Sequence, residues 1–136
     1  CFFFEKEKIV FTGDTLFSLG CGKIFEGDHK QMLTSLNKIK KLPGNTKIYC
    51  GREYTYKNAE FCIKYDSDNT DLKKKFEQIK KLRSDNLPTL PTTLEEELKS
   101  NIFLRCDQNN LKIKLNMENQ EDLKVFKKVR DLKDSF

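Results

Sequence analysis

Histidine and long apolar runs are scarce in this sequence. Its 136 residues contain one histidine, His29, and no tryptophan. A hydrolytic zinc site needs several converging ligands, so one histidine with scattered carboxylates cannot build such a site within this chain. No apolar run approaches the roughly 18 residues that a membrane span requires, and residues 1–4 are too short for a signal peptide. We therefore expect a soluble protein with no membrane partner.

Closely spaced cysteine pairs are also missing. The five cysteines are odd in number, scattered and never spaced as Cys-x-x-Cys, which excludes a disulfide framework and a zinc knuckle. This favours a reducing compartment. We expect a cytoplasmic location, with organelle targeting of a longer parent protein left open. Because the chain begins without methionine on a run typical of a mid-strand segment, we expect it to be part of such a parent protein.

The charge balance is only modestly basic. The 26 Lys and Arg residues against 21 Asp and Glu residues leave a net charge of +5 and a pI of about 8.9. Lysine pairs such as Lys80-Lys81 stand between periodic apolar residues, as on the solvated face of an ordinary helix. A basic helical protein that binds nucleic acid is the lesser alternative, because no groove-reading or base-stacking motif accompanies the lysines. We expect no nucleic-acid partner.

The first part of the chain alternates strands with a helix. Residues 2–4 and 8–12 are short and rich in aromatic and β-branched residues, which predicts two tightly joined strands. Residues 13–27 predict a glycine-rich loop whose backbone needs positive φ values or a close approach. Asp28 is the expected cap of the next helix, and residues 46–50 predict another strand. This order is typical of an α/β or layered α+β fold.

The second part is expected to be helical. Thr55 is predicted to cap a helix that runs to residue 65, and apolar residues at helical spacing predict another helix over residues 72–82. Residues 93–96 form a capping box for a short helix. Residues 107–122 are mostly polar and predict a long surface loop with room for a short strand. Residues 126–132 predict a final helix that faces the core.

Asp14 is the first residue to which chemistry can be assigned. It follows a predicted strand directly, at the end of the strand where layered α/β proteins commonly place ligands. Most aspartates in such loops turn the backbone through their own side chain. The other interpretation is a metal ligand, which would need further His, Asp or Glu residues nearby. The residues alone leave both interpretations open.

Five sequence blocks occur in a fixed order. One block would be weak evidence of kinship, but five in register are specific. They resemble successive signatures of glyoxalase II, the hydroxyacylglutathione hydrolase family of the metallo-β-lactamase superfamily. The resemblance covers nearly the whole chain and is weakest in the polar stretch. The blocks are FTGDTLF at residues 11–17, GCGK at 20–23, YCGREYT at 49–55, PTLPTTLEEE at 88–97 and NIFLR at 101–105, and the resemblance resumes with VRDLK at 129–133.

This resemblance implies an α+β fold. Residues 1–54 would form the second half of a metallo-β-lactamase-like αββα sandwich, and residues 55–136 a helical domain that binds the glutathione part of the substrate. The family hydrolyses S-D-lactoylglutathione to D-lactate and glutathione with two metal ions, usually zinc, with iron or manganese as alternatives. The metals supply a hydroxide nucleophile near neutral pH. By position, Asp14 matches the catalytic carboxylate that bridges both metals.

Substrate binding is implied at five positions. Lys23, Arg130 and Lys133 match family residues that bind glutathione, whose two carboxylates suit charge-assisted hydrogen bonds. Tyr54 matches an aromatic residue whose hydroxyl contacts the same ligand. Phe25 stands where the family commonly has a tyrosine, so one hydrogen bond of about 1 kcal/mol would be lost. Without the resemblance, Arg130 and Lys133 would be interpreted as an ordinary charged helix end.

Arg52 departs from the family more seriously. The family has a histidine ligand at this position, whereas arginine stays protonated and offers no lone pair to a metal. A unit charge about 4 Å from a metal ion would cost on the order of 4 kcal/mol per charge at an effective dielectric constant of about 20. We therefore expect Arg52 not to ligate a metal, and we hypothesise that it pairs with Asp14 in place of the missing cation.

The other ligand histidines of the family lie upstream of the matched region. We therefore expect this chain alone neither to hold two metals nor to hydrolyse thioesters, although its parent protein would be an enzyme. The alternative is a noncatalytic remnant that binds glutathione or similar anions beside a degenerate metal site. Without the other half of the sandwich, the apolar strand at residues 2–4 would be uncovered, and a non-native dimer could cover it.

Overall fold

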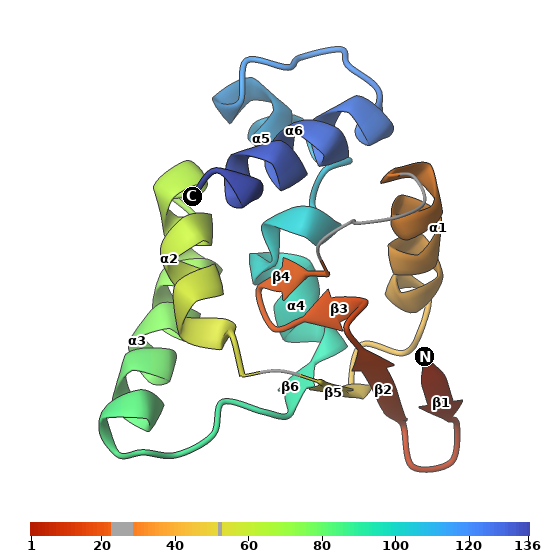
Figure 1. The fold of residues 1–136 in the computed structure, drawn as a ribbon, viewed down its shortest axis with the longest axis vertical. Coiled ribbons are helices and arrows are strands. Elements are labelled where there is room, and N and C mark those ends of the chain that lie inside the picture. The colour runs from red at the N-terminus through yellow and green to blue at the C-terminus, as the bar shows by residue number, and fades with distance from the viewer. Residues whose placement is uncertain (23–28, 52) are drawn as a thin grey trace.

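Four strands form the larger of two sheets in the computed structural model, which describes residues 1–22, 29–51 and 53–136 (Figure 1). The strands are β1 (Phe2–Phe4), β2 (Ile9–Gly13), β5 (Lys47–Cys50) and β6 (Thr92–Thr93). Their order is β1-β2-β5-β6, with β2 parallel to β5 and the two outer pairs antiparallel. β1, β2 and β5 confirm the strands predicted for residues 2–4, 8–12 and 46–50. β6 was not predicted, because its two residues are a strand only through their pairing with β5.

A small hairpin follows β2 within the predicted loop. Its strands are β3 (Leu16–Phe17) and β4 (Gly20–Cys21), which pair antiparallel. Gly13, just before the hairpin, has φ +52°, which confirms the expected need for a positive φ. At Gly20 an added Cβ would lie 2.6 Å from the side-chain nitrogen of Asn58, so a close approach is present as well. The prediction of a plain loop is wrong here, because burial against the helices orders this segment.

The described part of the chain contains six α-helices and one 3-10 helix. In Figure 1, α2 and α3 lie on one side of the hairpin and α1 on the opposite side, while α5 and α6 cover one end. The helices are α1 (His29–Lys40), α2 (Thr55–Tyr65), α3 (Thr70–Ser84), α4 (Leu94–Ser100), the 3-10 helix η1 (Ile102–Leu104), α5 (Asn109–Lys114) and α6 (Asp122–Asp134).

Helix ends agree with the sequence predictions only in part. The capping box of α4 at residues 93–96 is confirmed. The prediction that Thr55 caps α2 is wrong, because Thr55 is the first helical residue and the N-cap is Tyr54, which makes no side-chain cap bond. The prediction of a long loop over residues 107–122 is also wrong. The short helix α5 lies within it and is anchored by the fully buried Leu111. Asp28, the predicted cap of α1, lies outside the described residues.

One apolar core joins the sheet, the hairpin and the helices. The ring of Phe103 lies 6.1 Å from those of both Phe61 and Phe126, which links η1 to α2 and α6. The core-facing side predicted for the last helix is confirmed at Phe126 and Val129. The division at residue 54 stays a prediction, although β6 from the second region extends the sheet of the first. Among the described residues, no helix is both long and apolar enough to cross a membrane.

Candidate functional site

Two parallel strands end side by side and place Asp14 at their shared edge. β2 and β5 are in register up to the pair Gly13 and Cys50, after an irregularity. The backbone N–H of Gly51 then donates to the carbonyl of Gly13 at 2.8 Å. A Cβ at Gly51 would lie 3.1 Å from Oδ1 of Asp14, so the lack of a side chain there lets this carboxylate approach the end of β5. Asp14 is exposed, and such strand ends are where layered α/β folds bind ligands.

The hypothesised pair between Asp14 and Arg52 cannot be placed in full. Arg52 lies outside the described residues, as do the predicted substrate-binding residues Lys23 and Phe25. The structure does bring Asp14 to Gly51, the residue immediately before Arg52. Asp14 thus lies beside the end of β5, and its pair with Arg52 stays a prediction.

The metals implied by the resemblance need more ligands than the described residues bring together. Within residues 1–22, 29–51 and 53–136, no three His, Cys, Asp or Glu side chains converge on a point that could hold a metal. His29 packs edge-on against Phe126, with ring centroids 6.3 Å apart. Asp14 alone therefore does not fit a dinuclear metal site, which requires several protein ligands per ion.

Arg130 is buried and its guanidinium group is held by the protein itself. Its Nη1 donates to the carbonyl of Cys21 at 2.9 Å and lies 3.4 Å from that of Gly22. Its Nε and Nη2 donate to Oδ1 of Asp134 at 3.0 and 2.8 Å. The group also stacks over the ring of Phe103, 5.3 Å from its centroid. α6 thus brings Arg130 against the backbone of Cys21 and Gly22, at the end of the hairpin.

Lys133 and Tyr54 occupy more accessible places. Lys133 is half-buried, and its amino group lies 5.8 Å from the ring centroid of Phe61 and 5.7 Å from that of Phe136. Burial and then the neighbouring charge of Arg130 lower the pKa of Lys133 below its usual value. Tyr54 is 48% exposed and packs edge-on against Phe17 at the hairpin, with centroids 5.3 Å apart. Tyr54 is thus accessible beside the hairpin, and Lys133 is partly accessible on α6.

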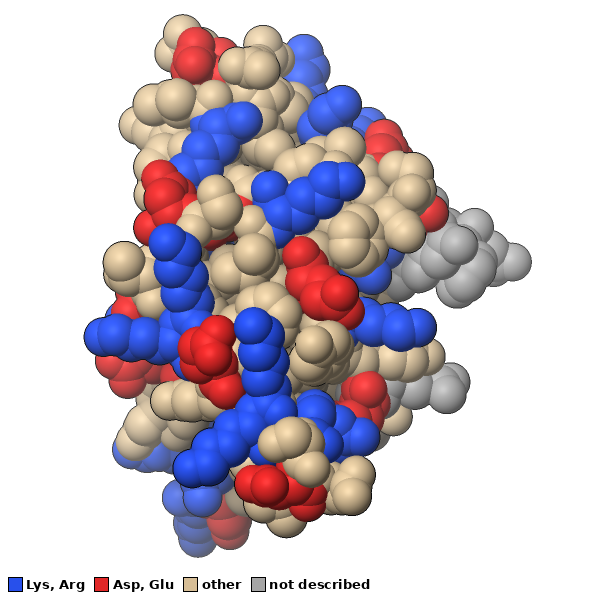
Figure 2. All heavy atoms as spheres, turned by 90° about the vertical axis from the view of Figure 1, so that its left-hand side faces the viewer, with Lys and Arg blue, Asp and Glu red and all other residues tan. Residues whose placement is uncertain are grey.

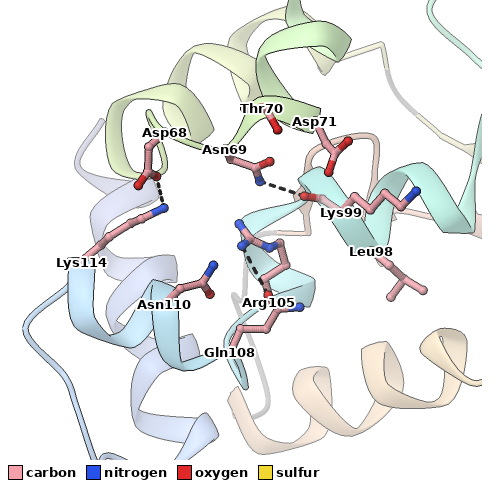
Figure 3. Close-up of a pocket in the computed structure, with 10 residues that line it drawn as sticks. All are labelled: Asp68, Asn69, Thr70, Asp71, Leu98, Lys99, Arg105, Gln108, Asn110 and Lys114. Carbon is pink, nitrogen blue, oxygen red and sulfur yellow. Dashed lines mark hydrogen bonds and ion pairs between the residues drawn. The ribbon is translucent and has the colours of Figure 1, made fainter.

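A hollow of about 360 Å³ opens elsewhere, between the start of α3, the end of α4 and α5 (Figure 3). Its basic residues are already paired. Arg105 forms an ion pair with the buried Asp66, and Lys114 forms ion pairs with Asp66 and Asp68. Although burial opposes the shift, these two carboxylates raise the pKa of Lys114. Since Lys99 pairs with Glu95, each basic residue that lines the hollow has a carboxylate partner, which makes it a poor candidate for the site of an anionic substrate.

Three buried polar residues near the hairpin were missed by the sequence predictions. Asn58, Glu97 and Asn101 are all buried, and each binds the backbone of the hairpin through its side chain. A signal was available, because Asn58 and Glu97 interrupt the apolar faces of α2 and α4. Buried polar groups need partners, so a polar residue on an apolar face indicates a specific contact.

These features define an α+β chain in which helices pack on a hairpin that follows a strand-edge carboxylate. The family model described as "Hydroxyacylglutathione hydrolase C-terminus" matches residues 53–136. The chain therefore belongs to the hydroxyacylglutathione hydrolase family, as the sequence blocks predicted.

Several curated relatives carry the name hydroxyacylglutathione hydrolase. The protein of Pelagibacter ubique is 55% identical over 136 residues, which is 100% of this chain and 51% of the relative. Those of Chelativorans sp. and Bartonella henselae are 48% and 47% identical over 135 residues, each covering 99% of this chain and 53% of the relative. The chain thus spans about half the length of the curated relatives that it matches.

Proposed function

We propose that this chain is the substrate-binding, carboxyl-terminal part of a parent enzyme that hydrolyses S-D-lactoylglutathione to D-lactate and glutathione. The observation that carries the proposal is 55% identity along the entire chain to a protein named for this class of reaction. The sheet of β1, β2 and β5 would then be the second half of an αββα sandwich. Asp14, exposed at the shared end of two parallel strands, supports a role at the reaction centre.

In the parent enzyme, two metal ions, zinc with iron or manganese as alternatives, would supply a hydroxide nucleophile. Asp14 would contribute one bridging carboxylate to them. Because the described residues do not form a dinuclear site by themselves, the other ligands would come from elsewhere in the parent. The 136-residue chain alone would hydrolyse no thioester.

The glutathione part of the substrate would lie between the hairpin and α6. Lys133 on α6 would supply a cation and Tyr54, which packs on Phe17 of the hairpin, a hydroxyl, and Lys23 and Phe25 belong to the segment that follows Gly22. Arg130 would act chiefly by holding the carbonyls of Cys21 and Gly22, because its nitrogens are already bound to those groups and to Asp134. A cation beside glutathione carboxylates gives the stronger, charge-assisted kind of hydrogen bond.

Calorimetric titration of the chain with glutathione tests this subsite. We expect saturable binding that weakens about tenfold or more in Lys133→Ala, since a hydrogen bond to a charged group is worth roughly 1.5–3 kcal/mol. Lys128→Ala is the matched control, because Lys128 is an exposed lysine on the same helix. Equal affinities for all three proteins would contradict the assignment of Lys133.

Hydrolysis is tested on the full-length parent. Release of free thiol from S-D-lactoylglutathione by the parent, and none by the 136-residue chain, is the expected result. Turnover by the chain alone would contradict its dependence on outside ligands. A parent that binds glutathione but contains no metal and releases no thiol would instead support the alternative, a noncatalytic remnant. Arg52 favours that alternative, because arginine cannot replace a histidine ligand.

The charge pattern supports a small anionic substrate over nucleic acid. On the face formed by α2 and α3, Lys and Arg side chains interleave with Asp and Glu, and no broad patch of one sign is visible (Figure 2). Proteins that bind nucleic acid concentrate positive charge on one face. None of the five cysteines, all of which the structure describes, is in a disulfide bond, and a reducing compartment such as the cytoplasm is part of the proposal.

The aromatic side chains on β1 and β2 would make the isolated chain associate. Phe2, Phe4 and Phe11 are 74%, 51% and 45% exposed. Phe4 packs edge-on against Phe11, which stacks on Tyr49, so the rings form one patch. An edge strand with such side chains is prone to pair with another chain. The proposal therefore includes a non-native dimer of the isolated chain that forms through β1. Light scattering should then give a mass that rises with protein concentration.

A further inference from the structure

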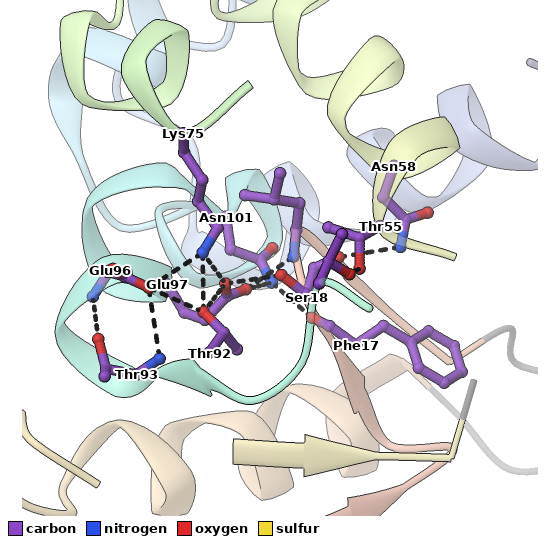
Figure 4. Close-up of polar contacts among 12 residues, drawn as sticks. Phe17, Ser18, Thr55, Asn58, Lys75, Thr92, Thr93, Glu96, Glu97 and Asn101 are labelled. Carbon is purple, nitrogen blue, oxygen red and sulfur yellow. Dashed lines mark hydrogen bonds and ion pairs between the residues drawn. The ribbon is translucent and has the colours of Figure 1, made fainter. Parts of the chain in front are cut away.

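The tip of the β3–β4 hairpin, residues 17–20, is held by side chains from two helices. Leu19 at its centre is fully buried and has φ +61°, a conformation that residues other than glycine rarely adopt. Its backbone N–H donates to Oε1 of Glu97 at 2.7 Å. Figure 4 shows Glu97 among its other partners, which include Ser18, Thr92 and Lys75. A strained residue persists only where its surroundings over-determine it, and the Glu97 carboxylate is the first such constraint.

Glu97 is fully buried, and both of its carboxylate oxygens accept hydrogen bonds. Its Oε2 accepts hydrogen bonds from the hydroxyls of Ser18 at 3.2 Å and Thr92 at 2.9 Å, and it lies 3.3 Å from the amino group of Lys75. A buried carboxylate is costly unless it is paired and hydrogen-bonded. Both oxygens of Glu97 meet that condition. The charge is therefore well accommodated where it binds the hairpin tip.

Two asparagines hold the carbonyls of the same hairpin tip. The side-chain nitrogen of Asn101, the residue after α4, lies 3.2 Å from the carbonyl of Phe17 and 3.1 Å from that of Gly20. It also lies 3.1 Å from Oε1 of Glu97. Asn58 on α2 donates to the carbonyl of Ser18 at 3.1 Å. Side chains from α2 and the end of α4 thus bind these carbonyls, as Glu97 binds the N–H of Leu19.

The hairpin connects the two predicted parts of the site. Asp14 lies just before β3 and Gly22 just after β4, and the N–H of Gly22 donates to the carbonyl of Thr15 at 3.0 Å. Gly22 is also close to Arg130. A shift of the tip would therefore move the strand-edge carboxylate and the start of the substrate-binding segment together.

We propose that Glu97 and Asn101 are positioning residues, which set the orientation of Asp14 and Gly22 by fixing the hairpin tip. This inference rests on the proposed function for its effect on the substrate. The anchoring itself rests only on the contacts above. A purely structural role would lower stability without a selective effect on the hairpin or on substrate affinity.

The test uses the full-length protein with Glu97→Ala and Glu97→Gln. Glu97→Ala removes the acceptor for the Leu19 N–H, whereas Glu97→Gln keeps one oxygen for it and is the variant to use if the alanine protein does not fold. The control is Asp66→Asn, which perturbs another fully buried carboxylate that pairs with Arg105 and Lys114, away from the hairpin. It is expected to lower stability through ion pairs that include no residue of the tip.

Amide hydrogen exchange and kinetics are the two measurements. Below each unfolding transition, exchange at Leu19, Thr15 and Gly22 should rise about tenfold or more in Glu97→Ala, less in Glu97→Gln, and not selectively in Asp66→Asn. The KM for S-D-lactoylglutathione should rise about tenfold in Glu97→Ala and change less than about twofold in the control.

Three outcomes would be decisive. Unchanged exchange at Thr15 and Gly22 in Glu97→Ala would overturn the proposal, because the tip would not transmit its position. Equal rises in amide exchange and in KM in Asp66→Asn would show that Glu97 only stabilises the fold, and this result would overturn the proposal as well. A wild-type protein that releases no thiol would refute the proposed function, while the exchange measurement would still decide whether Glu97 anchors the hairpin.

Discussion

Replacing Asp66 by asparagine should destabilise the fold strongly. Asp66 follows α2, and its side chain is 0% exposed, while those of its partners Arg105 and Lys114 are 6% and 24% exposed. Asparagine keeps the shape but removes the charge, which leaves the buried Arg105 guanidinium without its counter-ion. Removing one partner of a buried ion pair costs about 3–5 kcal/mol. Because Lys114 can turn to solvent, we expect the lower end, about 3 kcal/mol.

Urea unfolding followed by circular dichroism measures this loss. With a slope of about 1–3 kcal/mol per molar urea, the midpoint should fall by about 1–3 M. Asp68→Asn is the matched control, since Asp68 pairs with the same Lys114 but is 74% exposed. Its midpoint should stay at the wild-type value, because exposed pairs are screened by solvent. Equal midpoints for the two variants would refute the reasoning that burial makes the Asp66 pair matter.

Two further changes can be tested by the same method. Burial raises the pKa of the Cys21 and Cys62 thiols from 9.0 to about 12. The folded state then keeps protons that the unfolded chain loses, so this stability is fully present below pH 9.0 and declines as the pH rises toward 12. The double variant Cys21→Ala, Cys62→Ala should show a shallower decline of the urea midpoint, and an identical decline would contradict the prediction. Thr93→Ala removes the capping box of α4 and should cost about 1 kcal/mol. Lys99→Ala in the same helix is the control, and equal midpoints would argue against the cap.

Local sequence signals determined much of the secondary structure. The strands over residues 2–4 and 9–13, the helix at 70–84 and the capping box at 93–96 were predictable. Their periodicity or capping chemistry acts over a few neighbouring residues. The family was predictable too, because its blocks are contiguous. Asp14 was a candidate from its place directly after a strand, and its role stays a prediction.

Tertiary structure alone decided the rest. The strand β6 exists through its pairing with β5, and α5 through the burial of Leu111, so neither has a local pattern long enough to detect. Sequence could not show that Arg130 is occupied by carbonyls from residues 21–22, or that Glu97 reaches Leu19. Partners separated in sequence by 109 and 78 positions meet only when helices pack on the hairpin. Burial then decides whether a charged residue faces solvent or holds the backbone, because a buried charge must find its partners within the fold.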